Sequence, residues 1–266
     1  MLCLIRNQLT FTKKITTHRF FKMTPQSFKK IPVVLEALKQ PQSSRSILNY
    51  MCACDTANPE DRSKLNHEEI VGPLLNIWFA SGTSLDDFCK PFAKVVRELK
   101  ADPPTLIGKE WETLDGKVAK VLLADQLSRS CFRGTSEAFS FDHIGRKLVH
   151  ELINKTTIED TLKLPAAFLY LLPWALAHSE ELKDLDLACG LIDKFIEAHP
   201  NFNLFEGRNK QAVNQHRQVL EKFGRYPQRN GEFGRQNTVS EQAWLDDKEN
   251  LPMWAGGKLP FNKKIK

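Results

Sequence analysis

Apolar residues recur every three or four positions along most of this chain, whereas the strict alternation typical of β-strands is scarce. The first such stretch places Phe28, Ile31, Val34, Leu35 and Leu38 on one helical face. Helical patterns cover residues 27–39, 66–80, 84–99, 109–129, 137–154, 157–162, 166–177, 179–198, 204–223 and 238–245. We therefore predict an all-α protein of about nine helices that packs helix on helix in a single domain.

Turn and cap signals separate the predicted helices. Pro41 ends the first helix, and the Asp-Pro-Pro sequence at 102–104 forces a break after the third. Thr238 and Glu241 have the spacing of a capping box, which predicts that the last helix begins there. The longest apolar run, at 164–177, is shorter than the roughly 18 residues that cross a bilayer, so we expect no membrane span.

Positive charge is concentrated at the N-terminus. The net charge is +6, and residues 1–35 hold seven basic residues and no acidic one. A basic, acid-free segment that contains threonine is typical of an organelle transit peptide. Residues 1–26 are therefore predicted to direct the protein to a mitochondrion or plastid; a disordered basic tail, or translation from Met23, would leave it cytoplasmic. The remainder is near neutral, with 31 basic and 32 acidic residues, and gives no case for nucleic-acid binding.

The rest of the chain divides into a helical N-terminal extension (27–65), a helical domain (66–250) and a tail (251–266). The tail is rich in proline, glycine and lysine, so we expect it to be irregular. The six cysteines are scattered and form no C-x-x-C pair, which favours reduced thiols over a zinc site. We predict no metal and no cofactor.

Two short polar clusters lie near the middle of the chain. In the first, Asp125 and Arg129 are four residues apart and can pair on one helical face, and Arg133 and Asp142 follow them. These residues could line a pocket between two helices or form a structural ion-pair network. The second cluster is His178-Ser179-Glu180-Glu181, in which the histidine could act as a base, bind an anion or be a structural residue.

The third cluster is the densest, and it begins after His216. Three arginines, Arg225, Arg229 and Arg235, stand in a loop that also contains Pro227 and several glycines and aromatic residues. Guanidinium groups on a stiffened loop suit the bidentate binding of a carboxylate or phosphate. A structural role for the loop is an equally good interpretation.

These clusters resemble the domain-of-unknown-function family numbered 924, which is widespread in bacteria. The motifs that carry the resemblance are Asn76-Ile77-Trp78-Phe79, Leu123-Ala124-Asp125-Gln126 with Arg129, Phe132-Arg133-Gly134-Thr135, Phe139-Ser140-Phe141-Asp142, Phe168-Leu169-Tyr170, His178-Ser179-Glu180, His216, the run from Phe223 to Asn230, Gly234-Arg235, and Thr238 with Glu241 and Leu245. The resemblance spans about residues 66–246. It implies an all-α fold similar to tetratricopeptide-like right-handed helical arrays, and it brings no settled activity.

The resemblance also implies one shared polar site. The implied site residues are Asp125, Gln126, Arg129, Arg133, Asp142, His178, Glu180, His216, Arg225, Arg229, Asn230 and Arg235. The chain departs from the family pattern at Leu127, Ser128 and Ser130, and it has Ala175 where proline is usual. The charged residues are retained while neighbouring packing residues differ.

Two functions fit these residues. The first is a hydrolase or group-transfer enzyme for a small anionic metabolite, with His178, His216, Asp125 and Asp142 as catalytic candidates. Gln126, Arg129, Arg133, Glu180, Arg225, Arg229, Asn230 and Arg235 would then bind the ligand. The second is a binding or assembly module whose arginines clamp a peptide carboxylate. A narrow pocket would favour the first function and a long open groove the second.

Overall fold

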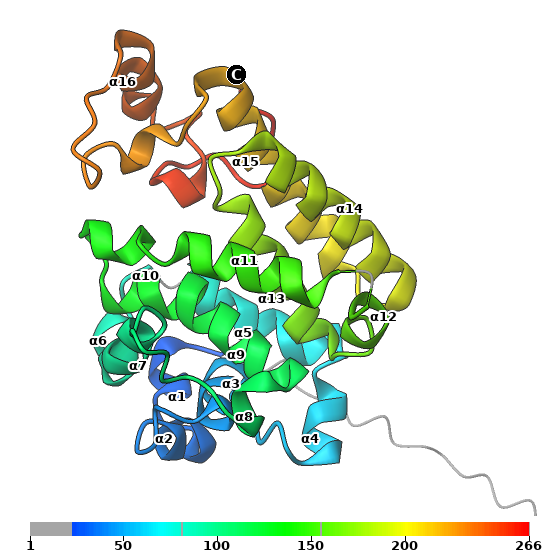
Figure 1. Cartoon of the computed structure of the whole chain (residues 1–266). Coiled ribbons are helices and arrows are strands. Elements are labelled where there is room, and N and C mark those ends of the chain that lie inside the picture. Colours follow the sequence, from blue (N-terminus) through cyan, green and yellow to red (C-terminus); the bar gives the residue numbers. More distant parts are fainter. Residues whose placement is uncertain (1–22, 81, 155, 266) are drawn as a thin grey trace, which may run out of the picture.

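The computed structural model describes residues 23–80, 82–154 and 156–265 (Figure 1). The all-α prediction is confirmed, because the described residues form helices and turns with a single isolated bridge between Pro252 and Leu259. They contain sixteen α-helical segments instead of about nine, since several predicted helices are divided. Most of the predicted targeting segment, residues 1–22, lies outside the described residues.

The N-terminal extension is helical, but its first helix is shorter than predicted. Its four helices are α1 (Pro25–Phe28), α2 (Pro32–Ala37), α3 (Ser44–Cys52) and α4 (Pro59–Lys64), and α5 (Glu68–Ala80) follows them. The single helix expected at 27–39 was wrong, because Pro32 lacks the N–H that a helix interior needs and instead occupies the first turn of α2. Phe28 and Tyr50 pack edge to face, which joins α1 to α3.

The predicted helices at 84–99 and 109–129 are also divided, the first by a 3₁₀ turn and the second at Thr113 and at a π-helical turn. The segments are α6 (Asp86–Cys89), η1 (Lys90–Phe92), α7 (Ala93–Glu98), α8 (Lys109–Glu112), α9 (Leu114–Leu122), η2 (Leu123–Leu127) and α10 (Ser128–Cys131). Thr113 ends α8 in an extended conformation, and its side chain caps α9. The segment η2 is π-helical, and all five of its residues are buried. A π-helical turn within an α-helix is frequent at functional sites.

The second half of the described chain contains a fully buried helix, α13. The elements of this half are η3 (Ser136–Phe139), α11 (Asp142–Leu152), α12 (Ile158–Thr161), α13 (Ala166–Ala177), α14 (Leu182–Ala198), η4 (Phe205–Lys210), α15 (Gln211–Phe223), η5 (Pro227–Arg229), α16 (Val239–Asp246) and η6 (Met253–Ala255). Every residue of α13 is buried, as expected for its uninterrupted apolar sequence. The capping box predicted at Thr238 and Glu241 is confirmed at the start of α16.

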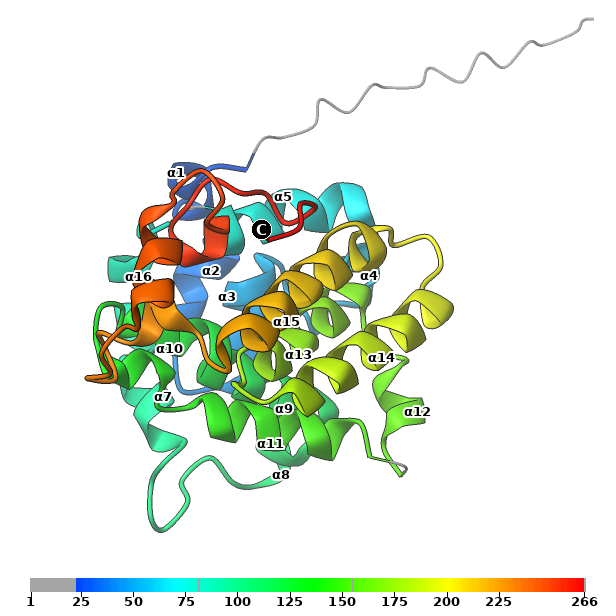
Figure 2. The same cartoon turned by 90° about the horizontal axis from the view of Figure 1, so that it is seen from above.

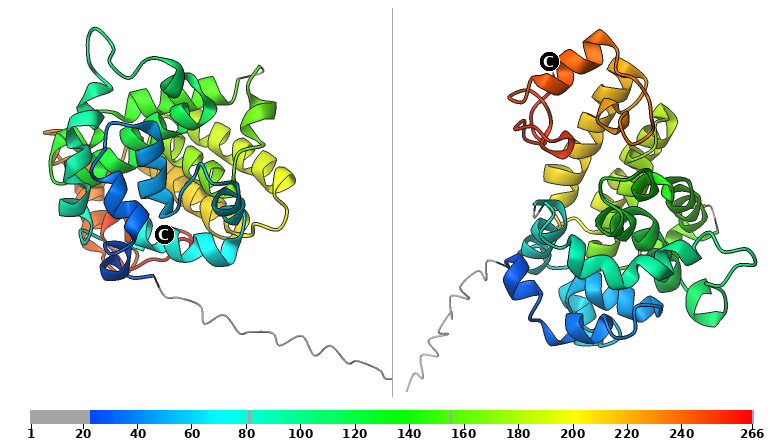
Figure 3. Two further views of the ribbon diagram at one scale, coloured as in Figure 1. Left: turned by 90° about the horizontal axis from the view of Figure 1, so that it is seen from below. Right: turned by 90° about the vertical axis from the view of Figure 1, so that its left-hand side faces the viewer.

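The two ends of the described chain lie on opposite sides of the molecule (Figures 1 and 3). The N-terminal helices form one side, and the segment from η5 onward forms the other, where it lies beside α15 (Figure 2). The tail folds back onto α15, because the side-chain amide of Gln215 donates to the carbonyl oxygens of Pro260 and Lys263 at 2.7 and 2.8 Å. One continuous hydrophobic cluster runs from Phe28 to Leu251. No described helix has both the length and the apolar character that crossing a bilayer requires.

Candidate functional site

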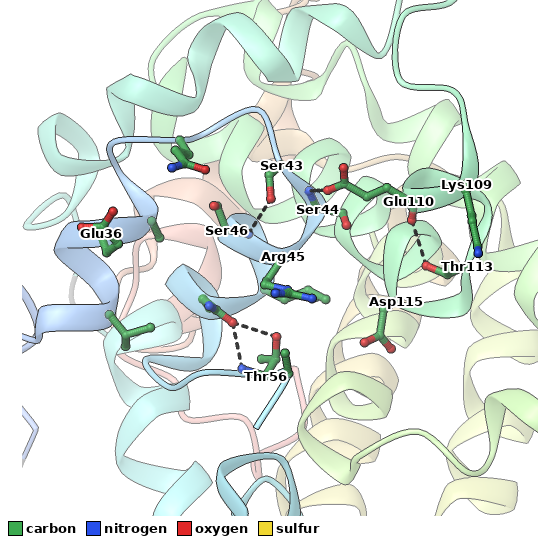
Figure 4. A pocket seen from close by; sticks show the side chains of 16 residues that line it. Glu36, Ser43, Ser44, Arg45, Ser46, Thr56, Lys109, Glu110, Thr113 and Asp115 are labelled. Atoms are coloured by element: carbon green, nitrogen blue, oxygen red, sulfur yellow. Dashed lines mark hydrogen bonds between the residues drawn. The ribbon is translucent and has the colours of Figure 1, made fainter. Parts of the chain in front are cut away.

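A cavity of about 770 Å³ lies between α2, α3 and the beginning of α9 (Figure 4). Its carboxylates already have partners. Glu110 accepts a hydrogen bond from the backbone N–H of Ser44, and Asp115 accepts two from Arg62 at 2.7 and 2.9 Å. The described residues that line this cavity include no histidine or cysteine. It therefore offers no imidazole or thiol among these residues, and we place the candidate catalytic site elsewhere.

The strongest constellation is a dyad formed by Asp125 and His178. Asp125 comes from the π-helical segment η2, and His178 follows the last residue of α13. The imidazole Nδ1 lies 2.6 Å from Asp125 Oδ1, and the Gln126 side-chain amide donates to Asp125 Oδ2. Because the ionised carboxylate can only accept, Nδ1 carries the proton and Nε2 presents its lone pair.

The charges around the dyad keep it in this protonation state. Burial alone would raise the pKa of Asp125, but the charges of His178 and Arg129 and the hydrogen bonds to it hold that pKa well below its usual value. Burial lowers the pKa of His178, Arg129 lowers it further, and the opposing effect of Asp125 does not offset them. The histidine is therefore neutral at physiological pH and is able to accept a proton.

Two arginines, Arg229 buried and Arg129 mostly so, share one carboxylate beside the dyad. Arg129 Nη2 lies 3.0 Å from one oxygen of Asp142, and Arg229 Nη1 donates to the other oxygen at 3.2 Å. Arg229 also donates to the backbone oxygen of His178 at 3.0 Å. Its guanidinium lies 4.9 Å from the ring centre of Phe139, so it is held on several sides. Arg129 Nη1 also lies 3.2 Å from Asp125 Oδ1, so two guanidinium groups and two carboxylates meet beside His178.

Two cavities open on either side of these residues, and His178, Arg229 and Phe139 line both. One, of about 270 Å³, is also lined by Arg129, Arg133, His216, Glu232 and Trp254. The other, of about 330 Å³, is also lined by Asp142, His143, Arg146 and Glu180. Their volumes are close to the lower end of the range for small-molecule sites. The residues that line the first cavity include three arginines and one acidic residue, Glu232.

His216 provides a second imidazole of fixed orientation beside the dyad. Its Nδ1 lies 2.8 Å from the backbone oxygen of Ala212, and because a carbonyl can only accept, Nε2 presents the lone pair. Burial, and to a lesser extent His178, lower the pKa of His216 to about 3. The ring centres of the two histidines are 5.8 Å apart. His216 is therefore a hydrogen-bond acceptor at neutral pH and carries no charge.

The structure brings together most, but not all, of the residues predicted for the site. Asp125, Arg129, Asp142, His178, His216 and Arg229 form one connected cluster, and Gln126 holds Asp125 from behind. Arg133 lines the first cavity while its guanidinium donates to Asp86 at 2.6 and 3.1 Å.

The remaining predicted residues hold the loop together. Glu180 lines the second cavity and accepts hydrogen bonds from Arg235 and from the backbone N–H of Tyr226. Asn230 is buried, and its side-chain amide donates to Asn237 at 2.8 Å. Arg225 lines neither cavity, because both oxygens of Glu241 accept hydrogen bonds from its guanidinium at 2.7 and 2.8 Å. The arginine-rich loop thus contributes one arginine, Arg229, to the connected cluster.

Sequence reasoning missed the aromatic wall of the site. Trp254, in the predicted irregular tail, stacks on His216 with ring centres 3.9 Å apart and an angle of 16° between the ring planes. Its indole N–H donates to Gln215 Oε1 at 2.9 Å, which fixes the ring. A tryptophan in an otherwise Pro-, Gly- and Lys-rich tail was the available signal. Phe139 was noted only as part of a motif, yet its ring lies against Arg129 and Arg229.

The comparisons agree with the resemblance seen in the sequence. The model of a family described as "Bacterial protein of unknown function (DUF924)" matches residues 71–249. This chain belongs to the DUF924 family. All twelve predicted site residues lie within the matched segment, whereas Trp254 and the whole N-terminal extension lie outside it.

A solved structure supports the helical fold of the DUF924 segment. A protein of unknown function from Agrobacterium tumefaciens is 26% identical, and the similarity covers 64% of this chain and 88% of that one with a TM-score of 0.52. No curated protein matches this chain. Neither comparison names a substrate or a reaction for the DUF924 protein.

Proposed function

We propose that this DUF924 protein is a hydrolase that acts on a small metabolite carrying a carboxylate or phosphate group. The observation that carries the proposal is one cavity whose lining residues include His178, oriented by Asp125, together with Arg129, Arg133 and Arg229. A neutral, carboxylate-oriented imidazole is a general base, and clustered guanidinium groups bind anions.

In the proposed reaction water is the nucleophile. His178 Nε2 takes one proton from a water molecule while the water oxygen attacks the electrophilic carbon or phosphorus of the substrate. The imidazolium that forms is stabilised by the Asp125 carboxylate, and it returns the proton to the leaving group as that bond breaks. A side-chain nucleophile is less suited, because the Ser179 hydroxyl already contacts Arg146 and accepts from the backbone N–H of Glu181.

Transfer to an acceptor other than water would use the same groups, and the peptide-clamp alternative has less support. Two cavities of about 270 and 330 Å³ suit a small ligand better than an extended chain. The pairing of Arg225 with Glu241 and of Arg235 with Glu180 also removes two of the arginines that a peptide clamp would use.

Hydrolysis can be tested with mixtures of candidate substrates. The protein is incubated in ¹⁸O-labelled water with pools of phosphomonoesters and carboxylate-bearing esters and amides, and products that carry one ¹⁸O are identified by mass spectrometry. We expect His178→Gln and Asp125→Asn to reduce the rate by about 10²–10⁴-fold, the usual contribution of general-base catalysis. Arg217→Gln serves as control, because Arg217 pairs with Asp186 and Glu221 outside the site.

Arg229→Lys provides the second arm of the test. Lysine keeps the charge but loses the fork of donors, so we expect a higher KM for the same substrate. The proposal fails if none of the pools yields a labelled product, or if a product appears at the same rate with folded His178→Gln protein. Urea unfolding midpoints of all variants establish that they are folded.

A further inference from the structure

Another cavity, of about 650 Å³, also has Trp254 in its wall. It is lined by residues from α5, η4, α15 and the tail, among them Asn76, Phe79, Arg208, Gln211, Trp254 and Phe261. Trp254 also lines the cavity beside His178, so this one ring forms a wall of both. His216 stacks on Trp254 at 3.9 Å and covers one of its faces.

Arg208 is the single charged residue among the described residues that line this 650 Å³ cavity. Its Nη1 donates to the Asn76 side-chain oxygen at 2.9 Å, and no carboxylate within the described chain pairs with it. The acidic residue of the same segment, Glu206, contacts Lys210 instead, and so does Asp193. A guanidinium with a neutral partner and no counter-ion, placed in a cavity, is suited to binding an anion.

Aromatic rings surround the Arg208 guanidinium. It lies 5.7 Å from the ring centre of Phe79 and 5.9 Å from that of Phe261. Phe79 is itself supported from behind by Trp174, with ring centres 4.8 Å apart and an angle of 28°. These contacts hold flat apolar surfaces next to the positive charge, an arrangement suited to a ligand with a planar ring beside its anionic group.

An unsatisfied polar atom in the same wall indicates a further contact. The side-chain oxygen Oε1 of Gln211 is buried and has no hydrogen-bond partner within the described residues. Gln211 follows Arg208 by three residues at the junction of η4 and α15, so the two side chains project from the same side of the helix. Leaving a buried acceptor without a donor costs roughly 1–3 kcal/mol, so a ligand N–H or O–H at this position would be stabilising.

We infer that this cavity binds a small planar aromatic anion, whose carboxylate or phosphate is held by Arg208 and whose ring packs among Phe79, Trp254 and Phe261. A hydrogen-bond donor on that ring system would reach Gln211. The proposal does not rest on the hydrolase activity, because none of the residues that carry it belongs to the Asp125–His178 dyad.

The experiment uses two matched pairs of probes on the full chain. 2-Aminobenzoate is compared with the uncharged 2-aminobenzamide, and AMP is compared with adenosine; dissociation constants come from saturation-transfer NMR titrations. We expect at least one anionic probe to bind saturably and at least tenfold more tightly than its uncharged partner. Which pair shows this difference distinguishes a carboxylate from a phosphate ligand.

Substitutions then locate the site. Arg208→Gln should weaken binding of the anionic probe at least tenfold and abolish the difference between the two members of the pair. Arg217→Gln on α15 should change neither value, and His178→Gln should leave binding intact. The proposal is overturned if no probe saturates below about 10 mM, if charged and uncharged probes bind equally, or if Arg208→Gln binds as tightly as the unmodified protein.

Discussion

Asp142 is the residue whose loss should most disturb the balance of charge at the site. Its carboxylate contacts both Arg129 and Arg229, and the exposed fractions of these three side chains are 17%, 16% and 7%. Asp142→Asn keeps the shape but leaves two adjacent guanidinium groups without their shared counter-ion. Removal of one partner from a buried ion pair costs about 3–5 kcal/mol, and we expect a loss of unfolding free energy in this range.

Urea unfolding followed by circular dichroism measures this loss, and Asp86→Asn is its matched control. Asp86 accepts two hydrogen bonds from Arg133, but the arginine side chain there is 45% exposed. An exposed pair contributes about 0.2–1 kcal/mol, so the control should lose several-fold less. In thermal unfolding, about 2–4 °C per kcal/mol for a chain of this size gives a decrease of roughly 6–20 °C for Asp142→Asn.

Stabilisation of Asp142→Asn by an added anion is the measurement that could refute this reasoning. If the cost comes from the loss of negative charge beside Arg129 and Arg229, phosphate should stabilise Asp142→Asn more than it stabilises the unmodified protein, because the anion replaces the missing carboxylate. Equal losses for Asp142→Asn and Asp86→Asn, together with no extra stabilisation by phosphate, would show that Asp142 does not hold the two arginines together.

Three further predictions concern other parts of the fold. Because the pKa of His178 is lowered from the usual 6.5, this general base becomes protonated only at a pH below 6.5. We therefore expect the acidic limb of the pH–rate profile for kcat/KM to have its midpoint below pH 6.5. Tyr226→Phe removes the donor to the buried backbone oxygen of Ala177, and a loss of about 1–3 kcal/mol should be seen by urea unfolding. Gly116→Ala would press a Cβ into the backbone of Glu110 and Trp111, so α8 must shift; we expect a lower thermal unfolding midpoint, with a loss of about 1–3 kcal/mol.

The helical class and several helix ends could be read from the sequence because their causes are local. The side chains of Thr238 and Glu241 each accept a hydrogen bond from the backbone N–H of the other residue. Because the two residues are only three positions apart, this cap could be predicted without a tertiary structure. The ion pair between Asp125 and Arg129 followed from their four-residue spacing. The π-helical turn at 123–127 was not visible, because it depends on packing between buried residues of neighbouring helices.

The membership of the site was harder to predict because arginines that are neighbours in sequence have different partners in space. Arg225 and Arg229 stand on one loop, yet the first is held by Glu241 and the second by Asp142, which is far away in the chain. No sequence spacing distinguishes these outcomes. Trp254 was missed for the same reason, since its contact with His216 depends on how the tail folds back.

The position of Trp254 separates the wall of the cavity from the charged groups beside it. The matched family segment contains the dyad and both arginines but ends at residue 249, before this tryptophan. A change confined to the segment that follows α16 can therefore reshape the space in front of His178 while the dyad and the arginines keep their own contacts.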